Sequence, residues 1–155
     1  MVKENNPFNK TMQLAILEAK LAFKRNEIPV GAVVIREGVT VSKAGNETAA
    51  NLNPTFHAEI LALQRAVDVL GTLLFECDLY VTLEPCPMCA HAISLYRVRR
   101  LYIAAEDKKG GGVINGPKIY SQPSCHHAPE VYDGICSMEA SFLLKSFFKK
   151  LRNNN

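Results

Sequence analysis

The chain has 155 residues, of which 48% are hydrophobic, and this size and composition predict one compact domain spanning residues 1–155. No apolar run approaches the roughly 20 residues of a membrane span, and the chain opens with no signal peptide, so we expect a cytoplasmic protein without membrane segments. Five cysteines, an odd number, do not indicate a secreted disulfide framework, and a net charge of +3 falls short of a dedicated nucleic-acid-binding protein.

Helices and strands alternate along the chain without repeats or low-complexity segments. Apolar residues at helical spacing from Phe8 to Phe23 predict a first helix that ends before Pro29. The further expected elements are, in order, a tight hairpin of strands at 31–35 and 39–45, a helix from His57 to Gly71, a strand at 79–83, a helix opening at Pro85 and running to about Tyr96, a strand at 100–105, a long glycine-rich loop, a short strand near 131–135, and a final helix. This order predicts an α/β fold, a three-layer sandwich with helices on both faces of a mixed sheet of about five strands.

Two fragments, His57-Ala58-Glu59 and Pro85-Cys86-Pro87-Met88-Cys89, together predict a catalytic zinc site. Imidazole and thiolate are ligands that zinc prefers, and three protein ligands leave the fourth tetrahedral position free for water. Because residues i and i+2 lie about 200° apart around a helix, His57 and Glu59 are expected at a helix start, where Asn53-Pro54-Thr55 offers turn and cap residues. There Glu59 can reach the water rather than the metal, as a general acid/base requires.

The Cys-x-x-Cys pair has other common uses, as a redox pair or as half of a structural zinc site. A redox pair would leave His57 and Glu59 unexplained, and a structural site would need a fourth ligand. The remaining candidates lie in mid-helix, in a proline-bracketed loop or beside apolar positions, where packing or surface roles are expected: His91, Cys125, His126, His127, Cys77 and Cys136. Because both thiols open a helix, the exposed N–H groups there favour thiolate over thiol.

The paired fragments are the signature of the zinc-dependent nucleobase deaminases, and almost the whole chain resembles the bacterial tRNA-specific adenosine deaminases. Further stretches that carry the resemblance are 28–33, Asn46, 79–86, 107–111 and Phe147-Phe148. The resemblance implies the cytidine-deaminase fold, a homodimer, one zinc ion per chain and a tRNA anticodon loop as partner. The implied reaction is hydrolytic, because a zinc-activated water attacks C6 of the wobble adenosine, yielding inosine and ammonia.

The resemblance also assigns roles to single residues. It implies that His57, Cys86 and Cys89 bind zinc, that Glu59 shuttles protons, that Asn46, Val30, Ala58 and Leu83 line the base pocket, and that Asp107 reads the neighbouring nucleotide. From the sequence alone, these pocket residues could equally end a strand, fill the core or support the glycine-rich turn. Glu84 could simply stabilise the helix that follows it. The sequence departs from the usual family pattern at His91 and at 112–115, which affects the RNA-contacting loop rather than the chemistry.

Basic residues gather at 97–100, at 108–109 and along the last helix, where they could contact phosphates or merely face solvent. Phe147 and Phe148 could stack on bases, but at least one is expected to pack in the core. Two other functions remain open. A deaminase of a free base or nucleoside, such as guanine or cytosine, shares the zinc signature but needs neither a basic helix nor the Asp107 loop. A non-catalytic, zinc-stabilised RNA-binding module would leave Glu59 without a purpose.

Overall fold

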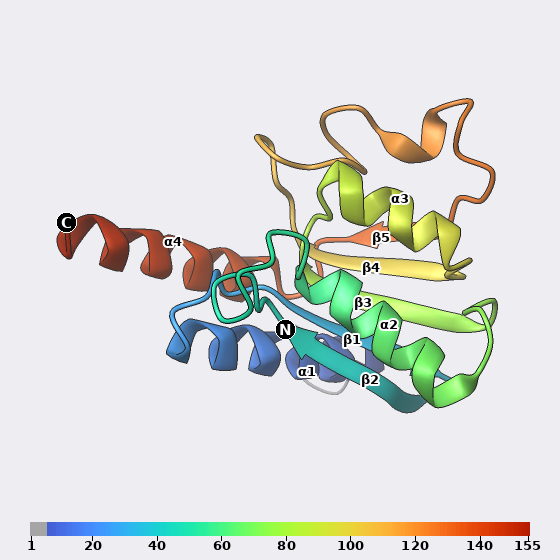
Figure 1. The fold of residues 1–155 in the computed structure, drawn as a ribbon, viewed down its shortest axis with the longest axis horizontal. Coiled ribbons are helices and arrows are strands. Elements are labelled where there is room, and N and C mark those ends of the chain that lie inside the picture. The colour runs from blue at the N-terminus through green and yellow to red at the C-terminus, as the bar shows by residue number, and fades with distance from the viewer. Residues whose placement is uncertain (1–5) are drawn as a thin grey trace.

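The structure, a computed structural model, describes residues 6–155. Five strands form one mixed sheet in the order β2-β1-β3-β4-β5 (Figure 1). The elements along the chain are α1 (Pro7–Lys24), β1 (Gly31–Arg36), β2 (Val39–Gly45), α2 (Ala58–Leu70), β3 (Cys77–Leu83), α3 (Pro87–Leu95), β4 (Arg100–Ala105), the short 3-10 helix η1 (Ile119–Ser121), β5 (Glu130–Asp133) and α4 (Ser137–Asn153). Strand β1 is antiparallel to β2 and β3, whereas β3, β4 and β5 are parallel. The predicted mixed α/β sheet is confirmed.

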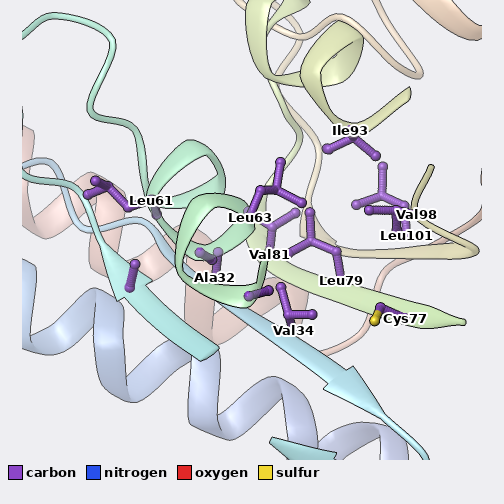
Figure 2. Close-up of a cluster of buried hydrophobic side chains, with 14 of the residues drawn as sticks. Ala32, Val34, Leu61, Leu63, Cys77, Leu79, Val81, Ile93, Val98 and Leu101 are labelled. Atoms are coloured by element: carbon purple, nitrogen blue, oxygen red, sulfur yellow. The ribbon is translucent and has the colours of Figure 1, made fainter. Parts of the chain in front are cut away.

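Each face of the sheet has its own hydrophobic core, because successive strand side chains point to opposite faces. Ala32 and Val34 of β1 pack under α2 and α3, together with residues such as Leu79 and Val81 of β3 (Figure 2). Val33, between them in sequence, faces α1 and α4 instead. Helices therefore cover both faces, and the three-layer arrangement is confirmed.

Helix α1 lies close to the sheet because Gly31 has no side chain. A Cβ atom added at Gly31 would overlap the backbone carbonyl of Ala15 and lie 2.7 Å from the backbone nitrogen of Ala19. Both alanines are fully buried, as are Met12 and Ile16 on the same helix face. Small residues thus let helix and strand backbones approach directly.

Several boundaries differ from the sequence prediction. Cys86 is the N-cap of α3, so the proline of its first turn is Pro87 and not Pro85. His57 is the N-cap of α2, and Asn53 instead accepts hydrogen bonds from the backbone and hydroxyl of Thr55. Strand β5 begins one residue earlier than expected, and all four of its side chains are exposed. The Glu37-Gly38 hairpin turn is confirmed, since both residues have the positive φ values (50° and 76°) that such turns use.

Three tyrosines form a ladder across the parallel part of the sheet. Tyr80, Tyr102 and Tyr132 are in register on β3, β4 and β5, and their ring centroids lie 4.3 and 5.1 Å apart. The ladder faces α1, where Phe8 contacts the ring of Tyr102 at 5.4 Å. Aromatic contacts thus connect three strands that are distant in sequence.

The last helix begins against the sheet and ends away from it (Figure 1). Phe147 is 3% exposed and contacts Phe23 of α1, whereas Phe148 is 41% exposed. The expectation that at least one of the two packs in the core is confirmed. Among the described residues, no helix is long and apolar enough to cross a membrane.

We predict that Gly31→Ala lowers the free energy of unfolding by about 1–3 kcal/mol, because the added methyl group has no space against the α1 backbone. Urea denaturation would measure the change. Lys24→Ala, on the exposed side of the same helix, is the control and should change stability by less than about 0.5 kcal/mol. Equal effects of the two substitutions would contradict the close packing of α1 on β1.

Candidate metal centre and active site

The side chains of the predicted zinc site converge because α2 and α3 begin side by side. Strand β3 leads through Glu84 and Pro85 directly into Cys86 at the start of α3, which places Cys89 in the first turn. His57 occupies the equivalent position of α2. The His57 Nδ1 atom lies 3.6 Å from the Cys86 sulfur and 3.4 Å from the Cys89 sulfur.

This geometry fits tetrahedral zinc. With Zn–N near 2.0–2.1 Å and Zn–S near 2.3 Å, a tetrahedral angle places nitrogen and sulfur ligands about 3.5 Å apart. The ligand atoms of His57, Cys86 and Cys89 all lie within 4.8 Å of one another, and no other such group occurs among residues 6–155. One imidazole and two thiols are also the donor set that zinc prefers over hard, oxygen-binding cations.

The two thiols share one proton. The side-chain hydrogen bond with Cys89 lowers the pKa of Cys86 to about 4, although burial acts in the opposite direction. The same hydrogen bond, together with burial, raises the pKa of Cys89. A bound cation deprotonates both thiols, so metal uptake releases a proton and weakens as the pH falls.

Glu59 lies beside the ligands without belonging to them. Its side chain is 4% exposed and lines the same cavity as His57 and Cys86. Burial raises the pKa of Glu59 to about 7, although its own backbone N–H acts in the opposite direction. A carboxyl group with a pKa near neutrality can both accept and donate a proton, as an acid/base catalyst must.

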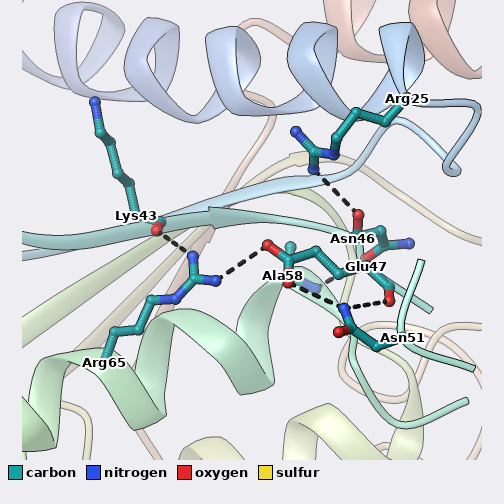
Figure 3. Close-up of polar contacts among 7 residues, drawn as sticks. All are labelled: Arg25, Lys43, Asn46, Glu47, Asn51, Ala58 and Arg65. Carbon is teal, nitrogen blue, oxygen red and sulfur yellow. Dashed lines mark hydrogen bonds and ion pairs between the residues drawn. The ribbon is translucent and has the colours of Figure 1, made fainter. Parts of the chain in front are cut away.

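The cavity above these residues has a volume of about 380 Å³, large enough for a nucleobase. Val30, Asn46, Leu83 and Asp107, four of the five predicted substrate contacts, lie in its wall. Ala58 does not, since it is fully buried and donates its backbone N–H to the side-chain oxygen of Asn46 at 2.8 Å (Figure 3). Ala58 therefore acts on the cavity by orienting Asn46, whose oxygen it occupies.

Asp107 also supports its own turn, as one reading of the sequence expected. Its Oδ1 atom accepts hydrogen bonds from the backbone of Lys109 (3.1 Å) and Gly110 (2.9 Å). The residue therefore shapes the glycine-rich turn and lies at the cavity as well.

Sequence reasoning missed two buried carboxylates that hold the loops around the cavity. Glu27 accepts hydrogen bonds from Thr48, Ala49 and Ala50, and Thr48 lines the cavity. Glu84 binds the loop at 107–115 rather than the helix that follows it. Hydrogen bonds from Asn115 and Asp107 outweigh the effect of burial and lower the pKa of Glu84. A buried acid in an apolar sequence context was the available signal, but its distant partners could not be read from it.

The histidines and cysteines near the end of α3 have packing roles, as expected. The Cys125 thiol contacts Ser94 of α3 and the backbone carbonyl of His127. The His127 ring forms a 2.7 Å hydrogen bond with the Val98 carbonyl. These contacts fasten the long loop to the segment between α3 and β4.

The cytidine and deoxycytidylate deaminase zinc-binding region matches residues 6–105, which include all three ligands and Glu59. The fold and the three-ligand site thus define a zinc-dependent deaminase, with the zinc-binding residues His57, Cys86 and Cys89.

The relatives narrow the class. The tRNA-specific adenosine deaminase of Agrobacterium fabrum is 48% identical over 91% of this chain and 93% of its own length. That of Aquifex aeolicus is 45% identical over 92% and 95%. A solved structure from a study of A-to-I editing by tRNA:A34 deaminases aligns with a TM-score of 0.84 at 48% identity, over 86% of this chain and 97% of that one. The chain belongs to the tRNA-specific adenosine deaminases.

A more distant likeness extends the fold without extending the function. A guanine deaminase from Nitrosomonas europaea aligns with a TM-score of 0.76 over 90% of this chain and 83% of its own, at 21% identity. The cytidine-deaminase-like architecture is therefore shared with enzymes that act on free bases.

We predict about one zinc ion per chain, lost together with activity in Cys86→Ala and in Cys89→Ala, because two ligands do not hold the ion. Elemental analysis of purified protein would measure the metal. The control Cys125→Ala should retain zinc, since that thiol contacts only Ser94 and His127. Full zinc occupancy without Cys86 or Cys89 would disprove the ligand assignment.

Proposed function

We propose that this protein hydrolyses the wobble adenosine of a tRNA anticodon to inosine and releases ammonia. The observation that carries the proposal is a buried Glu59 beside a three-ligand zinc site, in a nucleobase-sized cavity of a chain 48% identical to a tRNA-specific adenosine deaminase. A free-base deaminase shares the zinc signature. The basic surface near the cavity and the high identity to tRNA-specific enzymes favour RNA.

Glu59 moves protons in this reaction. When bound, zinc supplies the Lewis acidity that makes water an effective nucleophile near neutral pH. The ionised Glu59 carboxylate removes a proton from the water that attacks C6 of adenine, and it then delivers protons to the ring nitrogen and to the departing amine. The carboxylate is regenerated when ammonia leaves, so one residue serves both steps.

The cavity wall holds the base. Val30 and Leu83 offer apolar surface for the faces of the purine ring, and the side-chain amine of Asn46 faces a hydrogen-bond acceptor of the substrate because Ala58 occupies its oxygen. Asp107, on the rim loop, contacts the neighbouring nucleotide. An anticodon loop is single-stranded, so its base enters the cavity without breaking a pair.

The RNA backbone is held by basic side chains near the cavity. Lys108 and Lys109 belong to the Asp107 loop. Helix α4 extends from the side of the sheet where α2 and α3 begin (Figure 1), and its outer half carries Lys145, Lys149, Lys150 and Arg152 beside the exposed Phe148. Positive charge and an aromatic ring together suit a single-stranded nucleic acid.

We further propose that the protein works as a homodimer. Apolar side chains at the far end of α2 and α3 are exposed and offer a surface for a second copy: Val69, Leu73, Phe75 and Leu95. Light scattering on the purified protein would measure its mass against the 17.1 kDa of one chain.

We predict that Glu59→Gln retains zinc and affinity for an anticodon stem-loop but lowers kcat by about 10²-fold to 10⁴-fold, because it removes the proton carrier and leaves the ligands intact. Inosine formation, elemental analysis and RNA binding would be measured together. Glu37→Gln, on the exposed hairpin turn, is the control and should behave as the parent. Retained turnover, or loss of zinc with activity, would disprove the assigned role.

The pH dependence provides a second measurement of Glu59. The base must be ionised, so activity should fall as the pH decreases through its pKa. Burial raises that pKa to about 7 and a bound cation acts in the opposite direction, so the acid limb should lie at or below pH 7. In Glu37→Gln the same limb should remain.

We predict that the parent deaminates an anticodon stem-loop with a wobble adenosine in strong preference to free guanine, cytosine or adenosine, and that its KM for the RNA rises steeply with salt. Removing Lys149 and Lys150 should flatten this dependence by about 0.7 log units per log unit of salt for each lost phosphate contact. The double variant Arg36→Ala, Arg97→Ala loses the same charge at the opposite end of the sheet and should retain the parental slope. A KM that is insensitive to salt in all three proteins, with turnover of a free base, would favour the small-molecule deaminase.

A further inference from the structure

Glu84 is the centre of a polar cluster between the end of β3 and the start of the metal-binding helix. Its side chain is 2% exposed, yet its carboxylate accepts five hydrogen bonds from residues that lie 23 to 31 positions further along the chain. Oε1 accepts from the Asp107 backbone (3.1 Å) and the Asn115 side chain (2.8 Å). Oε2 accepts from the backbone N–H groups of Val113 (3.2 Å), Ile114 (3.1 Å) and Asn115 (3.1 Å).

The loop at 107–115 depends on this carboxylate because it contains no helix or strand. It closes around Glu84 with almost no free space. A Cβ atom at Gly111 would overlap the Glu84 carboxylate, and one at Gly112 would lie 2.6 Å from the backbone nitrogen of Pro87 in α3. The loop is therefore seated directly on the first turn of the helix that carries Cys86 and Cys89.

Asn115 closes the loop on itself. Its side-chain amide donates to Glu84 at 2.8 Å and to Glu106 at 2.9 Å, so one neutral group bridges two carboxylates. Glu106 immediately precedes Asp107, whose own N–H also binds Glu84. Both ends of the loop are thus tied to one buried acid, and Asp107 is fixed where it lines the cavity.

We propose that Glu84 and Asn115 form a clamp that fixes the 107–115 loop on the start of α3 and so positions Asp107 to recognise the nucleotide next to the target adenosine. Glu84 and Asn115 are positioning residues: they act through the loop and not on the reacting atoms. The consequence for recognition rests on the proposed function, whereas the ordering of the loop does not.

The clamp should affect recognition and spare the chemistry. The zinc ligands are held by the N-termini of α2 and α3, and Glu59 follows His57 on α2. Releasing the loop therefore changes where Asp107 lies without removing a ligand or the proton carrier. A rise in KM with little change in kcat is the expected signature.

The test uses Glu84→Gln and Asn115→Ala in the full chain. Glutamine keeps the size of Glu84 but turns an amine toward N–H donors, and alanine removes only the bridging amide, so the second variant remains informative should the first fail to fold. Hydrogen exchange of residues 107–115 should be at least about tenfold faster in both, as expected for the loss of one or two buried hydrogen bonds. For an anticodon stem-loop, KM should rise at least about tenfold, kcat should stay within about twofold and zinc content should be unchanged.

A recognition role also predicts a change in selectivity that a merely structural role would not cause. Stem-loops that differ only in the nucleotide next to the adenosine should be discriminated by the parent and discriminated less by both variants. Ser121→Ala removes an exposed hydrogen bond to Lys118 on the adjoining segment and should match the parent in every measurement. Glu27→Gln removes the other buried carboxylate and should speed exchange at 48–50 but not at 107–115.

Unchanged loop exchange in Asn115→Ala and Glu84→Gln would overturn the clamp. Faster exchange with an unchanged KM and unchanged selectivity would overturn its role in recognition. Loss of zinc in Glu84→Gln with a well-ordered loop would place Glu84 in the metal centre instead. If the parent shows no activity on RNA, the proposed function fails, while the exchange measurements still decide whether the clamp orders the loop.

Discussion

Two helices must begin within a few ångströms of each other for this protein to hold a metal, and much of the architecture serves that requirement. The ligand atoms of His57, Cys86 and Cys89 belong to chain segments that are separated by a helix and a strand. They meet because α2 and α3 lie side by side on one face of the sheet and both start at the same edge. Each ligand sits at a helix N-cap or in a first turn, where the backbone is fixed by the helix itself.

The same arrangement explains how two glutamates with similar burial acquire opposite properties. Glu59 and Glu84 are 4% and 2% exposed. The pKa of Glu59 is raised because burial prevails there, whereas the pKa of Glu84 is lowered because several N–H donors offset its burial. A carboxyl group that exchanges protons and one that stays ionised as an anchor thus lie close together, and the number of donors around each decides between the two roles.

The ligands were readable from the sequence because their positions follow from local geometry. A histidine two residues before a glutamate favours a helix start, and a Cys-x-x-Cys pair after a buried strand favours another. The periodic strands and helices, and therefore the mixed sheet, followed from the same kind of local pattern. Which of Pro85 and Pro87 enters α3 was not decided locally, since either proline suits a first turn.

The parts that escaped prediction depend on contacts between distant segments. The loop after β4 has no hydrophobic period, so the sequence does not indicate that Val113, Ile114 and Asn115 point their N–H groups at Glu84. Ala58 was expected in the pocket wall, but it lies behind Asn46, because its N–H and not its side chain is used. In each case the missing information was which buried polar group satisfies which donor.

The tyrosine ladder gives the molecule a natural optical reporter. The chain has no tryptophan and five tyrosines, so near-ultraviolet absorption and emission come mostly from tyrosine, and three of these rings are stacked on one sheet. Tyr80, Tyr102 and Tyr132 come from three parallel strands whose register exists only in the folded chain. Separation of the strands must uncouple the rings, so the near-ultraviolet circular dichroism of the protein reports the integrity of the parallel half of its sheet without any added probe.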